Sequence, residues 1–248
     1  MTSRVWTWII VIALLGGSGS NQTYAQRTKY KESDVQNAGT ITGVVRFEGK
    51  VPKRKTLKVT IQDKACHHEP ILSEDLVVSE KGGVQWAVAS IKKITSGKPF
   101  PQQDSEDFVQ LDQKGCVFVP HVVVIPTGGT LRILNSDGIL HNVHITPRKN
   151  KSLNKAMPGK VKKMDVSFKR AETMRVTCDV HNWMKAWIIV AKHPYHAVTD
   201  PDGAFRMDDV PAGTYTVEIW HEKLGKQKKQ VTVKSGEETE VVFSLKKK

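Results

Sequence analysis

The sequence predicts an all-β protein built from β-sandwiches. From Gly39 onward, short segments alternate apolar and polar residues, and turn-forming residues separate them. Valine, isoleucine, threonine and aromatic residues dominate these segments, and no long stretch shows the 3.6-residue apolar period of a helix. Short strands separated by regularly spaced turns are typical of antiparallel sandwiches. The predicted strands cover residues 41–47, 57–61, 84–91, 117–125, 130–134, 141–145, 174–178, 187–191, 214–220, 229–233 and 240–245.

The first 25 residues have the features of an export signal. Arg4 is their only charge, an apolar run extends from Val5 to Leu15, and small residues stand at the positions that a signal peptidase reads before Gln26. We therefore expect an exported protein, periplasmic or secreted, whose mature chain begins at Gln26. The alternative is an uncleaved N-terminal anchor. Residues 26–38 are polar and are predicted to form a flexible tail.

The charge balance favours an anionic partner. The chain carries 38 Lys and Arg against 25 Asp and Glu, a formal net charge of +13, so acidic proteins, membrane surfaces and nucleic acids are all electrostatically suitable. Export makes nucleic acid an improbable partner, and a membrane surface is not required. Residues 148–170 hold nine basic residues and one acid, Asp165. This segment is either a solvated loop or a docking patch for an acidic protein.

The strongest chemical signal is a short loop after the predicted strand 174–178. Cys178, His181 and Met184 place a thiol, an imidazole and a thioether within seven residues, and the strand 187–191 follows at once. A loop this short can direct three side chains at one ion from the same side. Thiolate and thioether are soft ligands and imidazole suits copper, so this set favours a copper ion.

His141 supplies the fourth predicted ligand. It lies where the turn Asn135-Ser-Asp-Gly leads into the strand 141–145, within reach of a neighbouring loop. His144 is three positions further on, and an odd offset on a strand points to the opposite face. Two imidazoles and a thiolate with a weak axial Met define a blue copper site. The outer position of His181 makes it the expected exit path for an electron.

The pair HNVH and C-x₂-H-x₂-M resembles the cupredoxin family over residues 84–192. The resemblance implies a Greek-key sandwich, one type 1 copper, and single-electron transfer without enzyme activity. It also implies an acidic redox partner such as a c-type cytochrome or a dehydrogenase. In that family an Asn after the first His ties the ligand loops together, and Asn142 occupies this position. Asp179 replaces the usual Ser or Thr after the Cys, and its carboxylate is expected to favour Cu(II).

The C-terminal residues 193–248 resemble the carboxypeptidase regulatory-like domain, a transthyretin-like sandwich. The matching features are D-x-x-G-x-F, which begins at Asp200, and V-P-A-G-T-Y-x-V, which begins at Val210. This resemblance implies a structural or docking module. About 55 residues are few for a whole sandwich, and residues 39–59 are similar to the first strands of such domains. Residues 39–83 therefore either complete this sandwich, which makes the domain discontinuous, or extend the cupredoxin.

Cys66 and Cys116 remain once Cys178 is assigned to the metal. Two leftover cysteines in an exported protein most often pair, so a Cys66–Cys116 disulfide is favoured. The competing hypothesis is a second metal site that uses Cys66-His67-His68, or Cys116 with His121. A further copper site at the His193 and His196 pair is another alternative to a plain linker.

Three functions compete at this point. The first is an electron carrier, the second a copper-binding or copper-delivery protein, and the third a cupredoxin-like scaffold without metal. No nucleophile elbow, His-Glu-x-x-His motif or phosphate-binding glycine loop is present in the sequence. The complete ligand set argues against the metal-free scaffold, and the rate at which the metal leaves would separate the first two functions. The electron carrier is the leading interpretation.

Overall fold

The computed structural model describes residues 29–59, 66, 70–101 and 108–247. The predicted export signal, His67 and His68 lie outside the described residues. Within the described ranges all regular structure is β-strand, so the predicted all-β class is confirmed. No helix in this part of the chain is long and apolar enough to cross a membrane.

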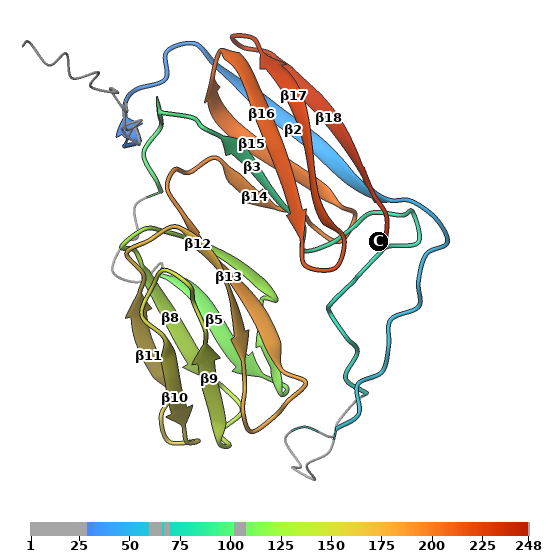
Figure 1. Cartoon of the computed structure of the whole chain (residues 1–248), viewed down its shortest axis with the longest axis vertical. Coiled ribbons are helices and arrows are strands. Elements are labelled where there is room, and N and C mark those ends of the chain that lie inside the picture. The colour runs from blue at the N-terminus through green and yellow to red at the C-terminus, as the bar shows by residue number, and fades with distance from the viewer. Residues whose placement is uncertain (1–28, 60–65, 67–69, 102–107, 248) are drawn as a thin grey trace, which may run out of the picture.

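Of the eighteen strands in the described residues, sixteen form two sandwiches (Figure 1), and β1 and β4 form a separate two-stranded sheet. The strands are β1 (Lys31–Glu32), β2 (Ala38–Phe47), β3 (Val88–Lys92), β4 (Ser96–Gly97), β5 (Val109–Lys114), β6 (Val117–Val119), β7 (Val122–Pro126), β8 (Thr130–Asn135), β9 (His141–Ile145), β10 (Leu153–Met157), β11 (Lys163–Ser167), β12 (Glu172–Thr177), β13 (Lys185–Ala191), β14 (His196–Val198), β15 (Ala204–Pro211), β16 (Gly213–His221), β17 (Gly225–Val233) and β18 (Glu238–Leu245).

The first sandwich contains β5 to β13. One sheet has the order β10-β9-β12-β13-β7, and the sheet packed against it has the order β11-β8-β5-β6. Strand alternation builds the core: in β12, Met174 and Val176 face inward while Thr173 and Arg175 do not. The apolar side chains between the two sheets fix the strand ends that carry the predicted ligands.

The second sandwich is assembled from two distant parts of the chain. Its sheets have the orders β14-β3-β16-β17 and β15-β2-β18, so β2 and β3 precede the first sandwich in sequence and the other strands follow it. This arrangement differs from the predicted boundary at residue 84. Residues 88–92, predicted within the cupredoxin domain, pair with β16, because Ala89 and Ile91 face the core of the second sandwich.

The start of the described chain also differs from the prediction. Residues 26–38 were expected to be a flexible tail, but β1 pairs in parallel with β4. The Tyr30 hydroxyl donates a hydrogen bond of 2.7 Å to the backbone oxygen of Lys98. These contacts hold the described part of the segment, from residue 29 on, against the second sandwich.

A long connection between β2 and β3 reaches the first sandwich. In Figure 1 it leaves the end of β2, runs down beside the lower sandwich and returns to β3. Leu57, Val59 and Ile71 from this connection pack against the first core. A separate apolar cluster joins the two sandwiches, and in it the rings of Trp187 and Trp220 meet edge to face at 5.1 Å.

The residues of the D-x-x-G-x-F pattern, which begins at Asp200, form a turn of the second sandwich. Asp200 accepts hydrogen bonds from the backbone N–H groups of Asp202 and Ala204, both at 2.9 Å. Gly203 has a φ of +78°, and a Cβ there would lie 2.5 Å from the backbone oxygen of Val45. Only glycine fits this close approach without strain. The D-x-x-G pattern is therefore a structural requirement of this turn.

Candidate metal centre

The two predicted ligand segments meet at one end of the first sandwich. His141 is the first residue of β9, and residues 178–184 form the loop that joins β12 to β13. Within that loop, the Met184 N–H donates to the His181 oxygen at 2.9 Å, and the Cys178 N–H donates to the Met184 oxygen at 3.3 Å. Two backbone hydrogen bonds thus close the loop, and its three predicted ligands are all buried.

Three of the predicted donor atoms converge. The Nδ1 atoms of His141 and His181 lie 2.9 Å apart, and the Cys178 sulfur lies 3.8 Å from the same nitrogen of His181. Metal bonds of about 2.0 Å to nitrogen and about 2.3 Å to sulfur place donors of one ion roughly 3 to 4 Å apart. The residues present therefore fit one metal ion. Met184 is buried in the apolar cluster that includes Cys178.

The surroundings of Cys178 favour its thiolate. Its sulfur accepts backbone hydrogen bonds from Asn142 at 3.3 Å and from His181 at 3.4 Å. Burial raises the pKa of this thiol, but the hydrogen bonds from His141 and from the backbone outweigh burial, and the net direction is down. The thiolate is the form that binds metals.

Asp137 is a site residue that sequence reasoning missed. Its carboxylate lies 2.8 Å from the Nε2 of His141 and accepts backbone hydrogen bonds from Gly115 and Cys116. Because Asp137 holds the Nε2 side of the His141 ring, the Nδ1 atom of that ring faces His181 and Cys178. Burial alone would lower the pKa of His141, but the hydrogen bond to Asp137 raises it to about 9 in the metal-free protein. The sequence offered one signal for this contact: an Asp four residues before His141, within the predicted turn.

Asn142 joins the two ligand loops, in the position that the cupredoxin resemblance implied. Its side-chain oxygen accepts the backbone N–H of Asp179 at 3.1 Å, and its amide donates to Asn154 at 2.6 Å. The carboxylate of Asp179 faces His144, at 2.9 Å, and the side-chain amide of Asn154, at 3.0 Å. These two contacts hold the carboxylate at the surface.

The structure buries His181, whose outer position had suggested an exit path. Its ring is 1 % exposed, because Cys66 and Trp183 cover it. Cys66 and Cys116 form a disulfide, and the Cys66 sulfur lies 4.0 Å from the Nε2 of His181. The Trp183 indole packs against the His181 ring at 5.1 Å and donates to the Cys116 oxygen at 3.0 Å. Trp183 thus excludes water from the loop.

Two other predicted metal sites, Cys116 with His121 and the His193 and His196 pair, do not assemble among the described residues. His121 pairs with Glu222 between the sandwiches. The rings of His193 and His196 stack at 4.6 Å, and burial lowers the pKa of His193 to about 4 and that of His196 to about 3, so both are neutral. None of these three histidines belongs to a group of three His, Cys, Asp or Glu donors within the described residues.

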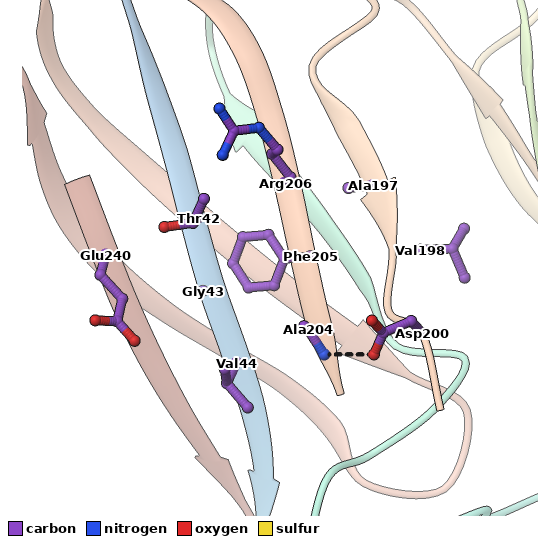
Figure 2. A pocket seen from close by; sticks show the side chains of 10 residues that line it. All are labelled: Thr42, Gly43, Val44, Ala197, Val198, Asp200, Ala204, Phe205, Arg206 and Glu240. Atoms are coloured by element: carbon purple, nitrogen blue, oxygen red, sulfur yellow. Dashed lines mark hydrogen bonds between the residues drawn. The ribbon is translucent and has the colours of Figure 1, made fainter. Parts of the chain in front are cut away.

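A surface hollow lies on the second sandwich, away from His141, Cys178 and His181. It encloses about 440 Å³ between the edges of β14 and β15 and beside β2 (Figure 2). Two of its charged residues have partners: Arg206 bonds Asp208 and Glu238, and Asp200 accepts the Ala204 N–H.

Comparisons with known proteins bear on both sandwiches. The carboxypeptidase regulatory-like domain family matches residues 185–246. Three solved structures with partial matches are a purple cupredoxin from Nitrosopumilus maritimus, amicyanin from Paracoccus versutus and a copper-containing nitrite reductase from Thermus scotoductus. Their identities are 18, 21 and 21 %, with TM-scores of 0.29, 0.32 and 0.29. The matches cover 34, 42 and 40 % of this chain and 99, 97 and 24 % of theirs. No curated protein matches the chain.

The family match supports the carboxypeptidase regulatory-like segment that the sequence resemblance predicted. The family match begins at the first residue of β13, a strand of the first sandwich, and ends one residue after β18. Its continuous range does not include β2 and β3, the two strands that complete the second sandwich from the other side of the insertion.

Proposed function

We propose that this protein is an exported, periplasmic or secreted type 1 copper protein that carries single electrons between redox partners. The observation that supports this proposal is the convergence of two imidazole Nδ1 atoms and a thiolate at one end of a packed sandwich. With a buried Met184 in the same loop, the donors match the ligand set of blue copper sites. Bound copper would supply a Cu(II)/Cu(I) couple.

The surrounding residues hold this ligand set in place. Asp137 fixes the ring of His141, Trp183 packs on His181, and Asn142 links the two loops. Side chains restrained by packing and outer hydrogen bonds keep their positions when the charge of a bound ion changes. Little reorganisation favours rapid electron transfer. We propose electron carriage without catalysis, and the burial of the donors is in keeping with this role.

The partner we propose is an acidic redox protein, such as a c-type cytochrome or a dehydrogenase. Leu140 precedes His141 in sequence and is 47 % exposed, and Val161 is also exposed. Lys160 and Lys162 flank Val161 and are exposed, and the Lys162 amine lies near Gly138 in the turn before Leu140. An apolar centre with a basic rim suits an acidic surface.

Absorption and EPR spectra after Cu(II) addition test the copper proposal. An intense thiolate-to-copper band in the visible range with a narrow copper hyperfine splitting is expected, and Cys178→Ala should abolish the band. A colourless protein, or an ordinary tetragonal copper spectrum, would contradict the proposal. Loss of Cu(I) to a chelator within minutes would favour copper delivery over electron carriage.

The salt dependence of electron transfer tests the partner proposal. With an acidic cytochrome as the probe, the rate should fall steeply as ionic strength rises. Replacing Lys160 and Lys162 by Gln should lower the rate at low salt and flatten this dependence, while the visible spectrum stays the same. An electron-transfer rate that does not change with ionic strength would contradict electrostatic docking.

A further inference from the structure

The ring of His181 separates two groups of metal-binding atoms. Its Nδ1 faces His141 and Cys178, at 2.9 and 3.8 Å. Its Nε2, on the other side of the ring, lies 4.0 Å from the sulfur of Cys66. The Cys66 and Cys116 sulfurs and one ring nitrogen of His181 all lie within 4.8 Å of one another. The second group therefore has the spacing of a metal site, although its two sulfurs are joined in a disulfide.

We propose that reduction of the Cys66–Cys116 disulfide creates a second copper site, selective for Cu(I). Two thiolates are soft ligands and select Cu(I) over harder ions. The disulfide holds both cysteines in place on well-separated parts of the chain, and other contacts position Cys116 independently of it. Its backbone N–H donates to Asp137 at 2.9 Å, and its carbonyl oxygen accepts from Trp183 at 3.0 Å.

Burial makes a bound cation necessary if both cysteines of this pair are to be deprotonated. Cys66 is 3 % exposed and Cys116 is fully buried. Two thiolates without a cation would be costly in such surroundings, so either both thiols stay protonated or a cation joins them. A monovalent ion with two thiolates carries a net charge of −1, close to what a single buried thiolate carries. The proposal does not depend on electron carriage at the first site.

The chemistry balances with an external reductant. A phosphine takes up the oxygen of one water molecule and becomes a phosphine oxide, while the S–S bond breaks and two thiols form. Binding of one Cu(I) then releases both thiol protons to solvent and leaves a bis-thiolate complex. The imidazole of His181 lies between this ion and the first site, so copper held by the cysteine pair would be one ring away from Cys178.

The number of Cu(I) ions bound by the full chain tests the proposal. Oxidised protein and protein reduced anaerobically with a phosphine are titrated with Cu(I) against a chromophoric chelator. Reduction is carried to completion, which is verified by three alkylatable thiols in place of one. We expect one more Cu(I) per chain after reduction, and no gain in the Cys66→Ser, Cys116→Ser double variant. An equal count in both states of the wild-type protein would overturn the proposal.

A sulfur count at the metal separates this site from the first one. Cys178→Ser removes the thiolate of the first site, and the reduced variant is loaded with one Cu(I). X-ray absorption should then show two sulfur ligands, and only one or none when Cys66 is also replaced by Ser. Two sulfurs that persist without Cys66 would refute the assignment. The visible band of the oxidised, Cu(II)-loaded wild type reports on the proposed electron carrier separately.

Discussion

The Cys66–Cys116 disulfide should make a large contribution to the stability of the first sandwich. The bond closes a loop with a sequence separation of 50 residues. By the chain-entropy relation, a loop of this length destabilises the unfolded state by about 4 kcal/mol. Replacing both cysteines by Ser should therefore lower the free energy of unfolding by about that amount. For a chain of this size, the melting temperature should fall by about 8–16 °C.

Calorimetry of the metal-free protein is the assay, because bound copper would add its own stabilisation. Cys178→Ser is the matched control: it makes the same change at a buried cysteine of the same core without opening a loop. Its effect gives the cost of one such side-chain exchange. If the double variant lost no more than twice this amount, the connection between β2 and β3 would be held by packing of residues such as Leu57 and Ile71, and the entropic reasoning would be wrong.

Three further outcomes follow from the site and the turns. Asp137→Ala should weaken copper binding by about 10–100-fold in a chelator competition, with the β-sheet circular dichroism unchanged. The metal-free protein should lose stability as the pH rises from about 6.5 through 9, because the folded-state pKa of His141 is raised to about 9 and its stabilising charge is lost there; denaturant titrations should show this slope, and His141→Gln should remove it. Gly203→Ala should cost more than 2 kcal/mol in the same titrations, whereas Gly236→Ala, also at positive φ but with nothing within 4 Å, should cost about 1 kcal/mol.

Much of the fold was predictable because alternation and turn residues are local signals. The segments around Met174, Ile188 and Val217 were predicted as strands and are strands in the structure. Strand partners are not local, and this is why the boundary at residue 84 was misplaced. Nothing near Ile91 indicates that its strand pairs with β16, whose residues lie more than 120 positions further along the chain.

The donor set was predictable for a related reason. Cys178, His181 and Met184 lie on one short loop, so their spacing alone suggested a shared ion. Burial of His181 depends on Cys66, a residue 115 positions away, and could not be inferred from the loop. Asp137 was overlooked because an Asp in a turn is ordinarily read as turn chemistry. Only the structure shows that its carboxylate reaches the ring of His141.

The pairing of β18 with β2 has a consequence for how the chain folds. The two strands run in parallel from Glu238 opposite Thr40 to Leu245 opposite Phe47, and a hydrogen bond between them joins residues 196 positions apart. Contacts between residues so far apart in sequence form slowly, because the entropy cost of closing a long loop comes before the stabilisation that the contacts provide. The inserted sandwich, residues 109–191, needs no such closure among its own strands and can fold first. The last eight-residue strand then completes the molecule, so a chain cut before Glu238 would carry a folded first sandwich beside an unfinished sheet.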